Sequence, residues 1–230
     1  MKLAATLFDM DGLLIDSEVL WHEAEVEIFA ELGVDVAITS GRTTKGMFVS
    51  EVVEYWYARH PWVGIGTQDV VERLLDRVAF LVETRGVLLP GAVDALDLAA
   101  RYGPVALASS TPLELIERCL AHFSLRDRFA SVHSAEHEPY GKPHPAVFLS
   151  AASSLEVAPP ACLVFEDSSA GVLAAKAARM SVVAVPSADD RGEAAFALAD
   201  LVLDSLEELR EDWMAERYQR PAPRARHEVT

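Results

Sequence analysis

The chain has 230 residues, of which 51% are hydrophobic and 24% are charged. That length and composition are typical of a soluble globular protein with room for a sizeable core. Its 36 Asp and Glu outnumber 20 Lys and Arg, which gives a formal net charge of −16. This acidic excess argues against nucleic acid or an anionic membrane as a partner, because both attract basic surfaces.

The sequence shows no sign of export or of membrane insertion. The apolar stretch before Asp9 is too short for a signal peptide, and no apolar run approaches the roughly 18 residues of a membrane span. Cys119 and Cys162 lack the spacing of metal ligands, so we expect both to be buried and reduced. We therefore expect a cytoplasmic protein with no membrane partner, and we take it to be a monomer.

The chain begins with a short apolar run, Leu3 to Phe8, which predicts a strand buried on both faces of a sheet. Asp9 and Asp11 follow at its C-terminal end, and Gly12 allows the backbone to turn there. Two carboxylates that flank one residue repel each other and are costly beside a buried strand. A bound divalent metal, most simply Mg²⁺, would offset that cost. Taken alone, the motif is explained equally well by a strand that ends in a polar turn.

Residues 17–86 are predicted to form helices, with no convincing strand among them. Ser17 is placed to cap a first helix that runs from Glu18 to about Gly33. Two further stretches with apolar spacing of three and four follow at Met47–Tyr57 and Gln68–Thr84. We interpret this region as an inserted helical domain.

Two groups of side chains in this region are assigned to its structure. Glu23, Glu25 and Glu27 are interpreted as a solvated face of the first helix. Trp56 and Trp62 are expected to pack inside the insert, although either could stack on a sugar.

From Leu88 onward, short apolar runs alternate with amphipathic stretches, which predicts strands separated by helices. The predicted strands are Pro104–Ala108, Phe129–His133, Ala161–Phe165, Val182–Pro186 and Leu201–Leu203, and the predicted helices are Ala92–Arg101, Pro112–His122, Ala146–Leu155 and Ala170–Ala178. This alternation favours a parallel sheet with helices on both faces. We therefore predict an α/β protein with a Rossmann-like core formed by residues 1–16 and 87–215, an all-helical insert at 17–86, and a disordered tail at 216–230.

Polar clusters follow four of the predicted strand ends, where an open parallel sheet binds its ligands. They are Asp9 with Asp11, Ser109 with Ser110, Lys142, and Glu166 with Asp167. Each has a structural explanation, since Ser109 can cap a helix, Lys142 can lie on the surface, and acids are favourable at a helix N-terminus. Together they supply metal ligands, a hydroxyl, a cation and a nucleophile, which are the groups that phosphoryl transfer needs.

The chemistry of phosphoryl transfer assigns roles to the acids. Asp9 would attack phosphorus and form an aspartyl-phosphate. Asp11 would protonate the leaving alcohol and later activate a water molecule. Mg²⁺ would be held by Asp9, Asp167 and the backbone carbonyl of Asp11. Glu166 would act as a further ligand or support the ligands.

Ser109 and Lys142 would act on the phosphoryl group itself. The Ser109 hydroxyl and neighbouring backbone N–H groups, including that of Ser110, would bind the phosphoryl oxygens. Lys142 would pair with both Asp9 and the transferring group.

These motifs, in this order, resemble those of the haloacid dehalogenase superfamily of phosphotransferases. Asp9-Met10-Asp11-Gly12 resembles the first motif, Ser109 the second, Lys142 in YGKPHP the third, and Glu166-Asp167 in FEDSSAG the fourth. The resemblance extends to about residue 210. It implies that the helical insert is a cap that closes over the site, and that Gly12, Gly46 and Trp21 join the substrate-binding residues.

Within the superfamily, the chain is most similar to sugar-phosphate phosphatases that act on hexitol phosphates and 2-deoxyglucose 6-phosphate. The supporting stretches are Asp16-Ser17-Glu18, Val52 to Trp62 and Leu88 to Gly91. Related β-phosphoglucomutases carry a histidine where this sequence has Trp21, which favours a phosphatase. The sugar phosphatases carry a cap arginine where this sequence has Phe48, with Arg42 nearby, so the resemblance leaves the individual substrate open.

The sequence therefore predicts a Mg²⁺-dependent phosphatase for small sugar or sugar-alcohol phosphates. One alternative is a phosphohexose mutase of the β-phosphoglucomutase type, which would need a sugar bisphosphate. A second alternative is a phospho-accepting signalling module, which would leave the helical insert and Asp11 without a role.

Overall fold

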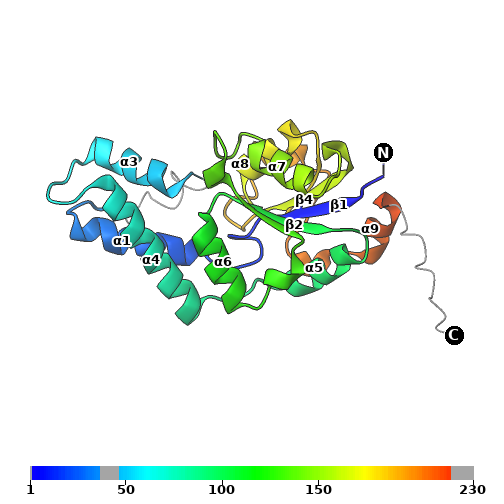
Figure 1. The fold of residues 1–230 in the computed structure, drawn as a ribbon, viewed down its shortest axis with the longest axis horizontal. Coiled ribbons are helices and arrows are strands. Elements are labelled where there is room, and N and C mark those ends of the chain that lie inside the picture. Colours follow the sequence, from blue (N-terminus) through cyan, green and yellow to red (C-terminus); the bar gives the residue numbers. More distant parts are fainter. Residues whose placement is uncertain (1, 37–46, 219–230) are drawn as a thin grey trace.

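The computed structural model describes residues 2–36 and 47–218. Their centre is a six-stranded parallel sheet with the strand order β3-β2-β1-β4-β5-β6 (Figure 1). The strands are β1 (Ala5–Phe8), β2 (Val105–Ser109), β3 (Ser131–Ser134), β4 (Cys162–Glu166), β5 (Ser181–Ala184) and β6 (Leu201–Val202). The chain builds outward from β1 through β2 to β3, and then returns to β4 on the other side of β1. Ligands bind where the strand order reverses in this way, so the ends of β1 and β4 mark the expected site.

Helices cover both faces of this sheet (Figure 1). Helices α5 (Ala92–Ala100) and α6 (Leu113–His122) contact one face, and α7 (Ala146–Ser154) and α8 (Ser169–Ala177) contact the other. Successive strand residues face opposite sides, so Phe8 and Phe165 belong to one apolar cluster while Leu7 and Val164 belong to the second. Strands buried on both sides explain why they appear in the sequence as uninterrupted apolar runs.

The insert contributes α1 (Glu18–Glu31), α3 (Val49–Arg59) and α4 (Thr67–Arg85), and none of its described residues lies in a strand. It extends from the strand ends as a separate lobe, at the left of Figure 1. Trp56 and Trp62 are buried with ring centroids 6.2 Å and 5.9 Å from that of Phe29. The predicted parallel α/β core with an inserted helical cap is therefore confirmed, and both tryptophans pack inside the cap as expected.

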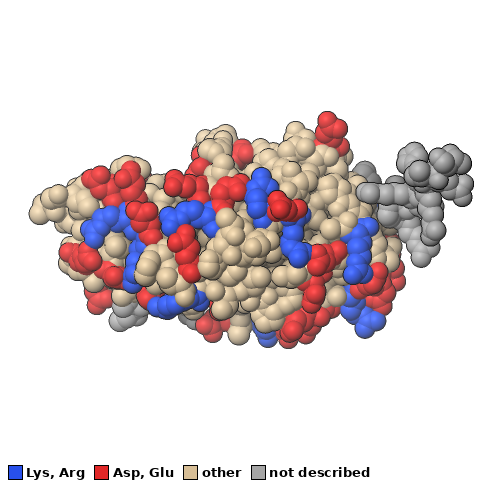
Figure 2. All heavy atoms as spheres, turned by 60° about the horizontal axis from the view of Figure 1, so that its bottom comes forward, with Lys and Arg blue, Asp and Glu red and all other residues tan. Residues whose placement is uncertain are grey.

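Ion pairs join α1 to α4 across their outer surfaces. Arg85 contacts Glu23 and Arg77 contacts Glu27, each at 2.7 Å, and Arg73 contacts Glu31. On the face shown in Figure 2, basic side chains lie interspersed with acidic ones. Glu23 and Glu27 thus form an exposed face as predicted. The same prediction for Glu25 is wrong, because only 8% of this residue is exposed.

Two local predictions also need correction. Ser17 precedes α1 as expected, but it caps no helix N–H and instead donates a hydrogen bond from its hydroxyl to Asp11. The expected disordered tail cannot begin at residue 216, because α9 spans Glu211–Arg217 and Tyr218 is fully buried. The Tyr218 hydroxyl lies 2.6 Å from Thr6 Oγ1 and donates to the carbonyl of Ala5. A buried aromatic anchor therefore holds this end of the chain against β1.

Most other element boundaries differ from the predictions by one or two residues, as expected where helix and strand ends fray. Cys119 and Cys162 are buried and unpaired, as predicted. Among the described helices, none has both the length and the apolar character needed to cross a bilayer.

Candidate active site

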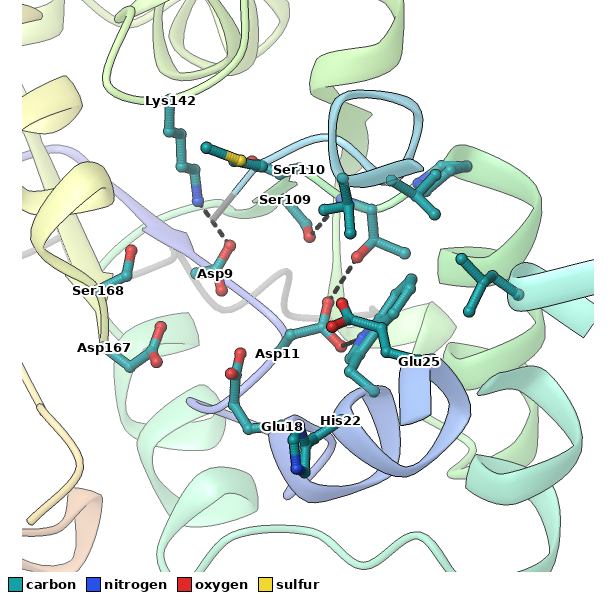
Figure 3. Close-up of a pocket in the computed structure, with 17 residues that line it drawn as sticks. Asp9, Asp11, Glu18, His22, Glu25, Ser109, Ser110, Lys142, Asp167 and Ser168 are labelled. Carbon is teal, nitrogen blue, oxygen red and sulfur yellow. Dashed lines mark hydrogen bonds and ion pairs between the residues drawn. The ribbon is translucent and has the colours of Figure 1, made fainter. Parts of the chain in front are cut away.

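One pocket collects most of the predicted site residues beyond the ends of β1, β2 and β4 (Figure 3). The predicted residues that line it are Asp9, Asp11, Trp21, Ser109, Ser110, Lys142 and Asp167. Trp21 belongs to α1, and the other residues end or follow strands. Those strands finish at the same edge of the parallel sheet, which brings residues that are far apart in the sequence together. The α1 helix of the cap forms the opposite wall of the pocket.

The side chain of Lys142 is almost fully buried beside Asp9 and Glu166. Its Nζ donates to Asp9 Oδ1 at 2.6 Å, to Glu166 Oε1 at 2.5 Å and to the carbonyl of Ala108 at 3.2 Å. Burial opposes the charge on this lysine, but the contacts with Asp9 and Glu166 outweigh burial and raise the pKa of Lys142 above its ordinary value. The ammonium is therefore charged and fixed beside the predicted nucleophile.

Three buried carboxylates surround this single lysine. Asp9, Glu166 and Asp167 each offer an oxygen, and these oxygens lie within 4.8 Å of one another. Burial raises the pKa of Asp9 well above its usual range, Lys142 lowers it, and the neighbouring carboxylates raise it again. Three acids with one ammonium leave an excess of negative charge, and a cation with oxygen ligands would remove that excess. The donor set therefore fits Mg²⁺, which prefers carboxylate oxygens.

Glu166 accepts hydrogen bonds at both of its carboxylate oxygens. Its Oε2 accepts hydrogen bonds from the backbone N–H and the hydroxyl of Ser168, while its Oε1 accepts from Lys142. Both oxygens are thus already engaged, which suits a residue that orients Lys142. Its predicted contribution to metal binding stays a prediction.

Gly12 is required where β1 turns towards α1. Its φ is +73°, and a Cβ atom there would lie 2.5 Å from Asp167 Oδ2 and 3.2 Å from Glu18 Cγ. A side chain would displace Asp167, so Gly12 allows the ends of β1 and β4 to approach each other. Its predicted contact with substrate stays a prediction.

Asp11, just before Gly12 in the turn after β1, also lines the pocket (Figure 3). Its Oδ1 accepts from the Ser17 hydroxyl at 2.6 Å and from Trp21 Nε1 at 3.2 Å, and its Oδ2 accepts from the Thr111 hydroxyl at 2.7 Å. Donors from α1, from Ser17 just before it and from the segment after β2 therefore fix the predicted acid–base group. The predicted site residue Trp21 contacts Asp11 directly.

The end of β2 and the segment after it provide hydroxyl and N–H groups to the pocket. Ser109 is buried, and its Oγ accepts a hydrogen bond from the N–H of Thr111. Ser110 Oγ is buried and finds no hydrogen-bond partner among the described residues. A buried hydroxyl beside a pocket is costly without a partner, so this arrangement suits a ligand with acceptor oxygens.

Several pocket residues were missed by the sequence analysis. Glu18, His22 and Glu25 line the pocket from α1, and Thr111 lines it from the segment after β2. The first three are spaced by four and three residues, which places them on one face of a helix. That spacing was the available signal, and it distinguishes Glu25 from Glu23 and Glu27.

The cap positions that bear on specificity are only partly described. Gly46 and Arg42 lie outside the described residues. Phe48 is not among the residues that line the catalytic pocket, and its ring lies against Gly141, where an added Cβ would be 2.9 Å from two ring carbons. At this position the cap therefore packs against the loop that carries Lys142.

Known proteins are similar to this one over most of the chain. Residues 3–179 match the family described as haloacid dehalogenase-like hydrolase. The chain is 47% identical over 210 residues to hexitol phosphatase B of Escherichia coli strain K12, an alignment that covers 90% of this chain and 95% of that protein.

Two solved structures have similar folds. One is CbbY from Rhodobacter sphaeroides in complex with phosphate, with a TM-score of 0.80, 30% identity, and coverage of 90% of this chain and 96% of that one. The other is a β-phosphoglucomutase from Clostridium difficile, with a TM-score of 0.79, 25% identity, and coverage of 94% and 97%. The family match includes all four motif segments, from Asp9 to Asp167. The chain therefore belongs to the haloacid dehalogenase-like hydrolases, and it is a phosphatase of that family.

Proposed function

We propose that this phosphatase hydrolyses monophosphates of small sugars or sugar alcohols, of the hexitol phosphate or 2-deoxyglucose 6-phosphate type. The reaction would use Mg²⁺ and an aspartyl-phosphate on Asp9. The observation that carries the proposal is the 2.6 Å contact between Asp9 and a buried Lys142 inside a cluster of three buried carboxylates. This arrangement holds a nucleophile and a cation where a phosphoryl group would approach from the pocket.

The first half of the reaction transfers the phosphoryl group to the protein. A carboxylate oxygen of Asp9 attacks phosphorus, and the bond from phosphorus to the sugar oxygen breaks. Asp11 gives its proton to the departing oxygen. Lys142 and the groups after β2 hold the phosphoryl oxygens. Mg²⁺, held by Asp9, Asp167 and the Asp11 carbonyl, would neutralise charge on those oxygens.

The second half releases inorganic phosphate. A water molecule attacks phosphorus and gives a proton to Asp11, and the bond from phosphorus to Asp9 breaks. Asp11 thus ends as it began, ready to act as an acid again. Its hydrogen bonds to Ser17, Trp21 and Thr111 support this role, because they hold the carboxylate on the pocket side of the turn.

The likeness to hexitol phosphatase B supports the substrate class, since it spans nearly the whole of both proteins. The likeness to a β-phosphoglucomutase keeps a phosphohexose mutase as the alternative. Trp21 favours the phosphatase. Its indole N–H donates to Asp11 where the mutases carry a histidine, and an indole cannot exchange protons as an imidazole can.

The test is phosphate release from a panel of sugar and polyol monophosphates, with added Mg²⁺ and with EDTA. Wild type is compared with Asp9→Asn, which removes the nucleophile while keeping its size. We expect release that needs the metal and disappears in the variant. Undiminished release by Asp9→Asn would contradict the proposed nucleophile.

A second measurement distinguishes the alternatives. Conversion of a hexose 1-phosphate to the 6-phosphate in the presence of a sugar bisphosphate, without phosphate release, would establish the mutase. A stable phosphorylated protein that transfers its phosphoryl group neither to water nor to a sugar would favour the signalling module.

A further inference from the structure

We propose that Thr111 is a positioning residue for the acid–base step, and that its hydroxyl directs Oδ2 of Asp11 towards the oxygen of the departing sugar or polyol. This inference rests on the proposed function, because it concerns the proton that Asp11 gives to the leaving group. It assigns that proton to one of the two oxygens of Asp11, and it gives a role to a residue that the sequence analysis missed.

The two carboxylate oxygens of Asp11 have different surroundings. Oδ1 accepts two hydrogen bonds, from the Ser17 hydroxyl at 2.6 Å and from the Trp21 indole N–H at 3.2 Å. Oδ2 accepts one, from the Thr111 hydroxyl at 2.7 Å. A carboxylate oxygen has about two acceptor positions, so within the described part of the chain Oδ1 is filled while Oδ2 has one position left.

This difference decides which oxygen of Asp11 can carry the proton. A proton on Oδ1 would displace one of its two hydrogen bonds, and the indole N–H of Trp21 can only donate. A proton on Oδ2 occupies the remaining position and leaves all three hydrogen bonds in place. Oδ2 is therefore the oxygen that exchanges protons, and Thr111 is the residue that contacts it.

Thr111 is itself held by the ends of two neighbouring strands. Its N–H donates to Ser109 Oγ at 3.1 Å, and its carbonyl accepts from the Ser134 hydroxyl at 2.6 Å. Ser109 and Ser134 end β2 and β3 and are paired in the sheet, and all three residues are buried. A β-branched side chain also has few rotamers available. The sheet edge therefore fixes the direction in which the Thr111 hydroxyl donates.

This fixed hydroxyl would act on the transfer of the proton. As the bond from phosphorus to the sugar oxygen breaks, the bond from Oδ2 to its proton breaks, and a new O–H bond forms on the departing oxygen. A general acid must lie within hydrogen-bond reach of that oxygen, so rotation of the carboxyl group would slow the step. The Thr111 hydroxyl opposes rotation and stabilises the negative charge that remains on Asp11, because hydrogen bonds to an ionised acceptor are stronger.

The experiment changes the leaving group, which separates proton donation from the rest of the reaction. Glucitol 6-phosphate releases an alcohol whose oxygen must be protonated, whereas p-nitrophenyl phosphate releases a stable phenolate anion that needs no proton. For both compounds kcat/KM is measured with Mg²⁺ present. This parameter covers the steps up to the departure of the leaving group and excludes the later attack of water on the aspartyl-phosphate.

Four proteins are compared. They are wild type, Thr111→Val, which keeps the shape of the side chain without its hydroxyl, Thr111→Ser, which keeps the hydroxyl, and Thr84→Val. The last is the matched control, because Thr84 lies on α4 outside the lining of the pocket and its hydroxyl donates to the carbonyl of Phe80.

We expect Thr111→Val to lower kcat/KM for glucitol 6-phosphate by about 10- to 100-fold and to leave kcat/KM for p-nitrophenyl phosphate nearly unchanged. Thr111→Ser should recover most of the loss, and Thr84→Val should match wild type with both compounds. Circular dichroism and a thermal melt establish that each variant is folded. If Thr111→Val does not fold, Ser134→Ala takes its place, because it removes the hydrogen bond to the Thr111 carbonyl and should show the same dependence on the leaving group.

The other outcomes are also decisive. An equal loss with both compounds overturns the proposal, because the Thr111 hydroxyl would then serve phosphoryl binding or the fold. Unchanged values with both compounds in a folded variant overturn it as well. If wild type hydrolyses p-nitrophenyl phosphate but no sugar phosphate, the proposed substrate class fails while this inference is still tested, with phenyl phosphate as the compound that has the poorer leaving group. If wild type releases phosphate from none of these compounds with Mg²⁺ present, the proposed function fails and this inference fails with it.

Discussion

Replacing Gly171 with alanine should disable the site without unfolding the protein. Gly171 lies in the first turn of α8, and a Cβ there would stand 1.9 Å from Glu166 Cδ, whereas ordinary contacts begin at 3.4 Å. The Glu166 carboxylate would have to move by about 1.5 Å to make room. Because Glu166 holds Lys142, and Lys142 contacts Asp9, the displacement is passed directly to the nucleophile.

The expected magnitude follows from that displacement. A misplacement of about 1 Å in a catalytic group can cost on the order of 100-fold in rate, so kcat for Gly171→Ala should fall by about that factor. Overpacking costs about 1–3 kcal/mol, and alanine returns up to about 1 kcal/mol through its better helix propensity. The protein should therefore remain folded.

The assay is steady-state phosphate release with a thermal melt of each variant, and Gly192→Ala is the control. A Cβ at Gly192 meets no atom within 4 Å, so that variant should match wild type in both measurements. Wild-type kcat in a folded Gly171→Ala protein would refute the reasoning, because Glu166 would then not determine the position of Lys142.

Three further predictions concern the rest of the molecule. Burial raises the pKa of the Cys119 thiol to about 12 and that of Cys162 to about 11. A thiol reagent at pH 8 should therefore label neither cysteine in the native protein and both in denaturant. Rapid labelling of the native protein would contradict their burial. Tyr218→Phe removes two buried hydrogen bonds, so urea denaturation should show that the free energy of unfolding falls by about 1–3 kcal/mol, while kcat is retained. An unchanged urea midpoint would contradict the role of Tyr218 as an anchor. A double-mutant cycle on the exposed pair Glu23–Arg85 should give a coupling of at most about 1 kcal/mol that falls with added salt, and a larger, salt-independent value would be inconsistent with an exposed pair.

The core of the site could be predicted because the end of each strand is visible in the sequence as a change from apolar to polar residues. Each strand is an apolar run, and Asp9, Ser109 and Glu166 stand where such a run stops. In a parallel sheet the C-terminal ends of the strands share one edge, so residues at those ends lie near one another in space. Their proximity could therefore be anticipated without coordinates, although the strand order that places β1 between β2 and β4 could not.

The features that the sequence did not predict depend on tertiary contacts. Ser17 has the composition of a helix cap, yet the nearby Asp11 offers its hydroxyl a charged acceptor, which makes the stronger hydrogen bond. Tyr218 lies next to a polar, proline-containing segment, and only its contact with β1 shows that it is an anchor. Glu25 was predicted to face solvent because it is charged. The helical period places it on a different face of α1 from Glu23, and that period was not considered.

The acidic net charge of the protein affects how it can attract a phosphorylated substrate. On the cap, Arg73, Arg77 and Arg85 are paired with glutamates of α1, so they form no basic surface that would attract a phosphorylated substrate. Within the site, Lys142 is likewise shared between two carboxylates. The Mg²⁺ that we propose at the cluster of Asp9, Glu166 and Asp167 would supply positive charge for the phosphoryl oxygens. Because the net charge of the whole protein repels anions at long range, we expect removal of that cation to weaken substrate binding strongly.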